Sequence, residues 1–249
     1  MKVQIASDIH IEKIYPKSPE ITDYIIPSSE TLILAGDIGS IYHYEVLKNF
    51  FISCKKNFEN VIYVPGNNEY YLRDGFEMKT FDELNEDLRK ISEETGVILL
   101  INEYIENEEY IIFGTTWWSF IPEVLHMKIH IEKDRQINSD DFNYLHCVSR
   151  KCLNKLIQRK GDKKLIVISH YCPTRLGTMN LHHKADDFID LVPYYFSSSE
   201  KYLRGAVDTW IYGHTHVFRD FLFDGGNTRI ISNADPRKRF FMRDFVVEL

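Results

Sequence analysis

The most regular feature of the chain is a series of short apolar runs, each of which ends at a polar residue, a glycine or a proline. Runs of roughly 4 to 8 apolar residues between such breaks are typical of strands that are buried on both faces. Apolar residues at helical spacing separate several of the runs, which is the pattern of an α/β architecture. The predicted strands are KVQIAS, TLILA, VIYV, VILLI, YIIFGTTWW, KLIVIS, TWIY and RIIS.

Three stretches have the apolar periodicity of a helix that packs on a sheet. The predicted helices cover residues 44–58, 82–95 and 139–161. Gly96 is typical of the residue just past a helix C-terminus, and Ser139 is a residue type that caps a helix N-terminus. Two segments with weak periodicity, Ser119–Ser139 and Leu176–Ser199, are expected to form loops or a partial lid over a site.

Length and composition indicate how the chain is organised. It has 249 residues, of which 44% are hydrophobic, and this is enough apolar mass for a sizeable core. The sequence contains no internal repeat, no low-complexity tract and no linker rich in proline, glycine or serine. We therefore expect one domain over residues 1–249.

Charge and hydropathy exclude several classes of protein. The net charge of −7 argues against a general nucleic-acid binder, whose affinity depends on neutralising phosphates. No apolar run approaches the roughly 20 residues of a membrane-spanning helix, and the N-terminal MKVQIASDIH lacks the apolar stretch of a signal peptide. The four cysteines have neither CxxC spacing nor the density of a disulfide framework. These features favour a cytoplasmic protein without a membrane partner, and they give no indication of its oligomeric state.

Residues that can bind metal ions follow the predicted strands directly. Asp8 and His10 come after the first strand, and in extended backbone residues i and i+2 point to the same side, so both could reach one ion. Asp8 could equally cap a turn. His214 and His216, in the sequence GHTH, are the strongest single signal, because two imidazoles directly after an apolar run fit neither a core nor a turn.

Taken together, the strand ends predict a metal site. Asp37, Asn67 and His170 also follow predicted strands, although each alone is typical of an ordinary strand end. Open α/β sheets bind ligands at the carboxyl ends of their strands. Imidazole, carboxylate and carboxamide ligands suit Mn, Fe, Zn or Ni better than Mg or Ca. Seven such side chains are too many for one tetrahedral ion and indicate two ions that share a bridging carboxylate.

The order of these motifs resembles the calcineurin-like metallophosphoesterase superfamily. The motifs are Asp8-x-His10, Gly36-Asp37, Gly66-Asn67-Asn68-Glu69, His170 and Gly213-His214-Thr215-His216. The resemblance implies a four-layer α/β/β/α sandwich with two mixed β-sheets and a dinuclear metal site at the C-terminal ends of the strands. It also implies a metal-dependent phosphoesterase in which a hydroxide between the ions attacks the phosphorus in line.

The resemblance further implies how the ligands divide between two divalent transition-metal ions. One ion is expected on Asp8, His10 and His216. The other is expected on Asn67, His170 and His214, with Asp37 bridging the pair. Manganese is favoured, with iron, zinc and nickel as alternatives. The expected partner is a small phosphorylated substrate or a phosphoprotein, and the choice between a phosphomonoester and a phosphodiester stays open.

Asn68 departs from the pattern of the superfamily, which usually has histidine at this position. That histidine is thought to stabilise the transition state or to protonate the leaving oxygen, whereas a carboxamide has no transferable proton. Losing a general acid typically lowers the rate about 10²- to 10⁴-fold for a poor leaving group. We expect Asp37 and Asn68 to be the catalytic residues, acting on an activated ester or together with another proton donor. The candidate donors are His43, His182 and His183.

Two alternatives to an active enzyme stay open. One is a metal-loaded protein of little or no activity that binds a phosphorylated ligand. The other is an interaction scaffold, as in the retromer scaffold subunit, which resembles this fold with a degraded site. The complete ligand set favours the enzyme. Around the site, we expect Glu69 to support the ligands without being one, Asn233 and Arg237 to border the pocket, and the pair Trp117–Trp118 to lie in the core.

Overall fold

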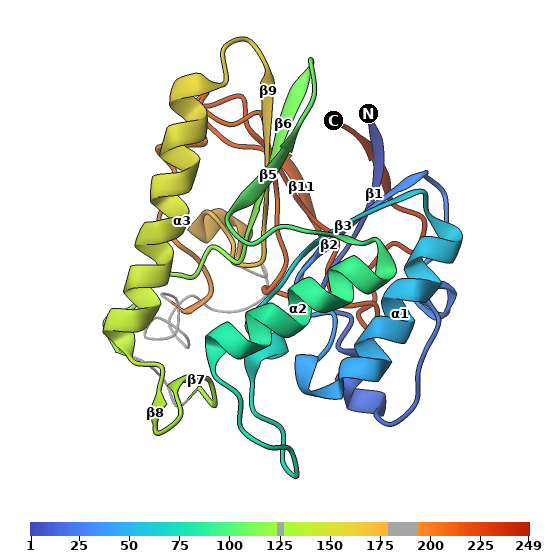
Figure 1. Cartoon of the computed structure of the whole chain (residues 1–249). Helices are drawn as coiled ribbons and strands as arrows, with labels where there is room; N and C mark the ends of the chain where they lie inside the picture. Colours follow the sequence, from blue (N-terminus) through green and yellow to red (C-terminus); the bar gives the residue numbers. More distant parts are fainter. Residues whose placement is uncertain (124–126, 179–193) are drawn as a thin grey trace.

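The structure is a computed structural model that describes residues 1–123, 127–178 and 194–249. Two mixed β-sheets pack face to face at its centre (Figure 1). The first sheet has the strand order β13-β1-β2-β3-β4, with only its edge strand β13 antiparallel to the neighbouring strand. The second has the order β11-β12-β10-β9-β6-β5, in which the four inner strands are parallel and both edge strands are antiparallel.

The strands that carry the site are short and follow the predicted apolar runs. The first sheet contains β1 (Lys2–Ala6), β2 (Thr31–Ala35), β3 (Asn60–Val64), β4 (Ile98–Leu99) and β13 (Val246–Glu248). The second contains β5 (Glu103–Glu106), β6 (Tyr110–Thr115), β9 (Lys164–Ser169), β10 (Thr209–Ile211), β11 (Arg219–Leu222) and β12 (Arg229–Ser232). A separate hairpin is formed by β7 (His130–Glu132) and β8 (Arg135–Gln136).

The side chains of the parallel strands alternate between two apolar clusters. In β2, Ile33 and Ala35 belong to the cluster between the two sheets, whereas Leu32 and Leu34 belong to the cluster beneath the helices. Every residue of β2 is therefore buried, which explains why its sequence is a continuous apolar run. The inner cluster joins both sheets through Val3, Ile5, Ile33, Ala35, Ile62, Val64, Leu100, Ile112, Ile166, Ile168, Ile211, Ile231 and Val247.

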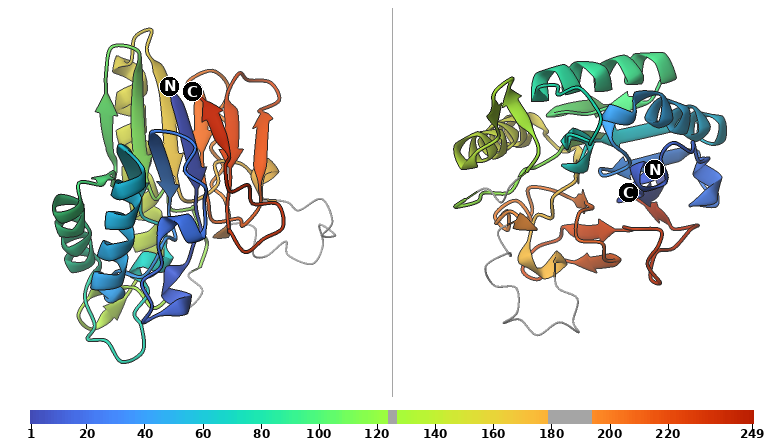
Figure 2. Two further views of the ribbon diagram at one scale, coloured as in Figure 1. Left: turned by 90° about the vertical axis from the view of Figure 1, so that its right-hand side faces the viewer. Right: turned by 90° about the horizontal axis from the view of Figure 1, so that it is seen from below.

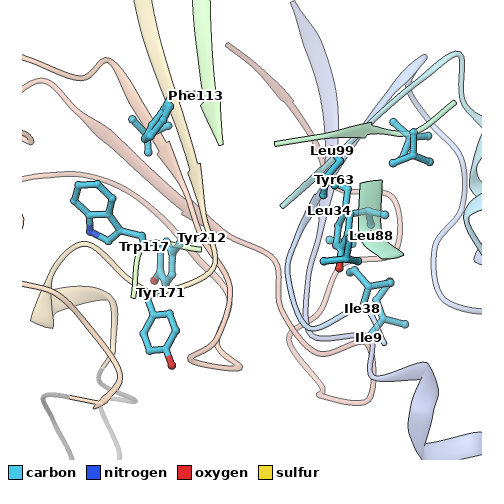
Figure 3. Close-up of a cluster of buried hydrophobic side chains, with 14 of the residues drawn as sticks. Ile9, Leu34, Ile38, Tyr63, Leu88, Leu99, Phe113, Trp117, Tyr171 and Tyr212 are labelled. Carbon is cyan, nitrogen blue, oxygen red and sulfur yellow. The ribbon is translucent and has the colours of Figure 1, made fainter. Parts of the chain in front are cut away.

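Helices cover the two outer faces of the sandwich and complete its four layers. α1 (Tyr44–Asn57) and α2 (Phe81–Thr95) lie over the first sheet, and α3 (Ser139–Arg159) lies over the second (Figures 1 and 2). Figure 3 shows Leu88 of α2 beside Leu34 and Tyr63 of the first sheet, and Trp117 near Tyr212 on the other side. The predicted α/β/β/α sandwich is confirmed.

Most of the predicted elements agree with the structure, and the differences are local. The helices differ from the predicted ranges by one or two residues at their ends. The cap of α3 is Asn138 and not Ser139, because the side chain of Asn138 accepts from the Asp141 N–H while Asp141 accepts from the Asn138 N–H. Trp117 and Trp118 are 0% and 3% exposed, so their prediction as core residues is confirmed.

The two segments predicted as loops have different outcomes. Ser119–Ser139 contains the β7–β8 hairpin, which the sequence pattern did not predict. In the segment Leu176–Ser199, residues 179–193, and with them His182 and His183, lie outside the described residues. Among the residues that the structure describes, no helix is both long enough and apolar enough to cross a membrane.

Candidate metal centre

The proposed ligands lie on turns that leave the strands through left-handed backbone. Asp8, His10, Asp37, His214 and His216 all have φ between 54° and 67°. The expectation of extended backbone at Asp8 and His10 is therefore wrong. Backbone hydrogen bonds instead join both residues to the turn after β2. The Asp8 N–H donates to Gly36 O at 3.0 Å, and the His10 N–H donates to Asp37 O at 3.0 Å. Left-handed backbone is unfavourable for residues other than glycine and tends to occur at functional sites.

Two glycines next to the ligands make room for them. A Cβ atom on Gly36, which has φ +84°, would overlap the imidazole of His170. A Cβ atom on Gly66 would overlap the carboxylate and the backbone nitrogen of Asp37. The glycines that precede Asp37 and Asn67 are thus required by the close approach of ligands from other strands, in addition to the turns themselves.

The first cluster consists of Asp8, His10 and His216. One ligand atom from each residue lies within 4.8 Å of the others. His216 Nε2 is 3.1 Å from Asp8 Oδ1 and 3.5 Å from His10 Nε2. Asp8 and His10 are buried, whereas the His216 side chain is 32% exposed, so solvent reaches the cluster from the side of His216.

The second cluster consists of Asp37, His170 and His214, together with Asn67. His170 Nε2 lies 3.2 Å from Asp37 Oδ1, 3.1 Å from Asn67 Oδ1 and 3.2 Å from His214 Nδ1. Asp37 lies between the two clusters, because its other oxygen, Oδ2, is 3.8 Å from His10 Nε2. The structure thus brings all seven predicted ligands together, and their role as ligands stays a prediction.

The four histidines are held so that one ring nitrogen of each faces the centre of the site. On the outer side, His10 Nδ1 donates to Glu12 and His216 Nδ1 donates to Asp235, both at 2.9 Å. In the second cluster, His170 Nδ1 donates to the carbonyl oxygen of Ala35, and His214 Nε2 donates to that of Tyr194, both at 3.0 Å. Because these oxygens only accept, each outer nitrogen carries a proton, and the inner nitrogen is the one that can offer a lone pair to a metal ion.

These facing lone pairs fit metal ions. The inner nitrogens of His10 and His216 point at each other, and that of His170 points at the oxygens of Asp37 and Asn67. Electron pairs that converge in this way repel one another unless a cation or a proton lies between them. A donor set of imidazole, carboxylate and carboxamide is suited to divalent transition metals.

In each cluster, the carboxylates favour a positive charge on one histidine. Burial opposes the charged imidazole, but nearby carboxylates outweigh this effect and raise the pKa of His170 to about 9 and that of His216 to about 10. Burial and the charge on His170 lower the pKa of His214 to about 4. Burial would raise the pKa of Asp37, but the charge and hydrogen bond of His170 hold it well below its ordinary value. Metal binding would replace the protons on His170 and His216 and release them.

Glu69 supports the backbone of the turns after β2 and β3. Among the described residues, it forms no hydrogen bond with the side chain of a proposed ligand. It is fully buried, and its carboxylate accepts from the N–H groups of Gly66 at 2.8 Å, Asp37 at 3.1 Å and Ile38 at 2.7 Å. The expectation that Glu69 supports the ligands fits these contacts.

Asn68 lies beside Asp37, with Nδ2 donating to Asp37 Oδ2 at 2.7 Å and its N–H donating to Asp37 Oδ1 at 2.9 Å.

Some residues at the site were missed from the sequence or serve differently than expected. Glu12 and Asp235 orient histidines, yet neither stands in a spacing that points to a ligand.

Arg237 Nε donates to Asp235 at 2.6 Å, so Arg237 reaches the rim of the first cluster as predicted. Asn233 is fully buried and its amide donates to the backbone of Ile5, so it supports the turn after β1. His43, a candidate proton donor, is only 9% exposed, and its ring stacks on that of Tyr15.

Comparison with known proteins places these features in context. The sequence model of the calcineurin-like phosphoesterase family matches residues 1–218, which contain all seven predicted ligands. An uncharacterized protein of Acanthamoeba polyphaga mimivirus is 30% identical over 213 residues, which are 78% of this chain and 74% of that protein. The crystal structure of phosphopantetheinyl hydrolase from Mycobacterium tuberculosis has the same fold, with a TM-score of 0.66 and 18% identity over 95% of this chain and 90% of that one.

Proposed function

Because this chain belongs to the calcineurin-like phosphoesterase family, we propose that it hydrolyses small phosphate esters with two metal ions held by the seven residues at the strand ends. Membership of the family makes the chain a metallophosphoesterase, and therefore a hydrolase. The proposal adds the ligand set, manganese as the preferred metal and a small phosphorylated molecule as the substrate. The fold supports such a substrate, since the similar structure is that of a phosphopantetheinyl hydrolase.

The observation that carries this proposal is the orientation of the histidines. His10, His170, His214 and His216 each tie the outer ring nitrogen to an oxygen acceptor and aim the inner one at the same small region. A protein without a metal has no evident use for four imidazoles fixed in this way at adjoining turns. Metal ions bound there would supply a nucleophile from water at neutral pH and positive charge for the phosphoryl oxygens.

The other residues of the site have contacts that suit the roles proposed for them. Asp37 turns one carboxylate oxygen toward each cluster, which is the arrangement required of a bridging ligand. Asn67 presents its carbonyl oxygen because its Nδ2 donates to the Tyr71 hydroxyl at 2.7 Å. Asn68 has a second amide N–H beyond the one given to Asp37, and this N–H is available to a substrate oxygen. With no proton to transfer, Asn68 favours esters whose leaving group is already a stable anion.

A screen of ester classes tests the proposal. The purified chain should hydrolyse an aryl phosphate or a bis-aryl phosphodiester when Mn²⁺ is added, more slowly with Fe²⁺, Zn²⁺ or Ni²⁺, and not after chelation. His214→Ala should lose the activity, whereas His130→Ala, a change in the β7–β8 hairpin, should keep it.

The same screen separates the enzyme from the two alternatives. Turnover no higher than that of His214→Ala, with every metal and ester, would contradict the enzyme. Tight binding of a phosphorylated ligand by the inactive, metal-loaded chain would then favour a binding protein, and failure to bind metal would favour a scaffold. The single domain and the cytoplasmic location stay predictions from the sequence.

A further inference from the structure

Arg73 is a positively charged residue beside the metal centre that none of the motifs includes. It lies five residues after Asn68, and its side chain folds back so that Nη2 donates to Asn68 O at 3.0 Å. The same nitrogen lies 3.8 Å from Glu12 Oε1. The side chain is 25% exposed, so the guanidinium is partly buried but open to solvent.

These two contacts place Arg73 next to both halves of the site. Asn68 donates from its side chain to Asp37 Oδ2 at 2.7 Å, and Glu12 accepts from His10 Nδ1 at 2.9 Å. Arg73 thus contacts the backbone of the residue whose side chain binds the proposed bridging ligand, and it lies near the carboxylate that orients His10.

Several polar atoms in this region have no hydrogen-bond partner among the residues that the structure describes. These atoms are Arg73 Nε, Glu12 Oε2 and His43 Nδ1, and all three are buried. Glu12 Oε1 accepts from His10, and its distance of 3.8 Å from Arg73 Nη2 is too long for a hydrogen bond. Buried polar groups without partners are unfavourable and call for a ligand or water. Arg73 therefore retains donors for an anion.

The charges at the site are nearly balanced, so an additional cation would favour the binding of a highly charged anion. The side chains of Asp8, Asp37, Glu12 and Asp235 reach the two clusters and carry about as much negative charge as two divalent ions carry positive charge, and Arg237 adds one positive charge next to Asp235. The histidines add no charge when they act as ligands. Arginine is always charged, and its planar fork matches the geometry of phosphate oxygens.

We propose that Arg73 binds an anionic oxygen of the substrate phosphate and thereby makes the site selective for phosphomonoester dianions over phosphodiester monoanions. The inference rests on the proposed function, since it concerns the same metal-loaded site. A dianion gains more from an additional positive charge than a monoanion does, because the Coulomb attraction scales with the charge of the anion.

Binding of inorganic phosphate tests the inference without relying on turnover. Calorimetry with the Mn²⁺-loaded protein should show phosphate binding that Arg73→Gln weakens about 10- to 100-fold, the usual effect of losing a hydrogen bond to a charged group. Arg73→Lys, which keeps the charge but loses the fork, should fall between the two. The control Arg89→Gln removes the same charge from the surface of α2, where Arg89 pairs with Glu103, and should bind as the wild type does.

Kinetics with two matched esters provide the second readout. Arg73→Gln should raise KM for an aryl phosphomonoester about tenfold and leave KM for the bis-aryl diester within about twofold. Metal content, measured on the same samples, should equal that of the wild type. Unchanged phosphate affinity, or equal effects on both esters, would overturn the inference, as would loss of metal from Arg73→Gln, since Arg73 would then merely position Glu12 and Asn68. Failure of the wild type to bind metal or hydrolyse any ester would instead overturn the proposed function.

Discussion

Asp37 directs one carboxylate oxygen to His170 at 3.2 Å and the other to His10 at 3.8 Å. Asp37→Asn removes the negative charge and replaces one of these oxygens with an amide nitrogen, which is a poor metal ligand. We therefore expect weaker binding of both metal ions and loss of hydrolysis, measured by metal titration and by the rate on an aryl phosphate. Asp74→Asn is the matched control, because the Asp74 side chain is 97% exposed. Two tightly bound ions with unchanged turnover in Asp37→Asn would show that Asp37 does not bridge.

Asn68 allows a test of the missing proton donor. Asn68→His places a titratable group at this position, and we expect it to raise the rate on alkyl phosphates more than on aryl phosphates. A gain of about tenfold corresponds to roughly 1.4 kcal/mol of barrier, which is within the range of a placed acid. The ratio of the two rates is the measurement, since a change in folding or metal content alters both alike. Equal effects on both esters, or a loss on alkyl esters, would contradict the missing-acid account.

The residues with a characteristic local signature could be predicted from the sequence, and those defined only by their spatial neighbours could not. GHTH and the Asp-x-His spacing are recognisable in one dimension. Asp235 supports His216 from 19 residues away, and Glu12 supports His10 from a short 3-10 turn, so both look like ordinary surface acids in the sequence. Arg73 likewise gains its position only when the chain folds back on Asn68.

At the level of elements, the turn after β3 depends on one buried carboxylate. Glu69 accepts from the N–H groups of Gly66, Asp37 and Ile38, so it joins the turn after β3 to the turn after β2. Glu69→Ala leaves these buried N–H groups unpaired, and we expect it to lower the free energy of unfolding by about 2 kcal/mol or more. Urea denaturation in the presence of a chelator measures this without a contribution from metal binding. The exposed Glu77→Ala serves as the control, and a loss no larger than that of Glu77→Ala would show that water satisfies the turn.

The helices and the buried inner strands could be predicted because hydrophobic periodicity is a local property, whereas the edge strands β5, β11 and β13, which are largely not buried, were not predicted. α2, for example, was predicted to within one residue, since Leu84, Leu88 and Ile91 repeat on one face. The backbone conformation of the turns could not, because tertiary contacts impose it. Asp8 adopts a left-handed conformation where its N–H binds Gly36 O, and sequence alone does not reveal that partner. The β7–β8 hairpin was missed because its strands have only three and two residues.

At the scale of the whole molecule, the proposed metal centre joins the two sheets. Asp8, Asp37 and Asn67 follow strands of the first sheet, whereas His170, His214 and His216 follow strands of the second. Metal binding should therefore stabilise the entire fold. At a free metal concentration about 100 times Kd, the expected gain is about 2.7 kcal/mol per site for a ligand that binds only the folded state.

Urea denaturation with and without Mn²⁺ measures this stabilisation. The midpoints from circular dichroism and from tryptophan fluorescence should rise together, since both sheets share one inner cluster. In His170→Ala the shift caused by metal should be largely lost, whatever the stability of that variant without metal. A shift seen by only one of the two probes would mean that the ions stabilise a part of the molecule and not the whole.

The contacts around Ser7 have a consequence for the order in which the chain is made on the ribosome. All seven proposed ligands have been synthesised by residue 216, but the turn that carries Asp8 is held by later residues: the Ser7 N–H donates to Asn233 O at 3.2 Å, and the Asp235 N–H donates to Ser7 O at 3.1 Å. A nascent chain of 218 residues, the length matched by the family, would thus possess every ligand before it possesses their support. We expect a truncated chain of residues 1–218 to retain less metal on dialysis than the full chain. The nascent protein would then bind its metal ions tightly only after the last strands have been translated.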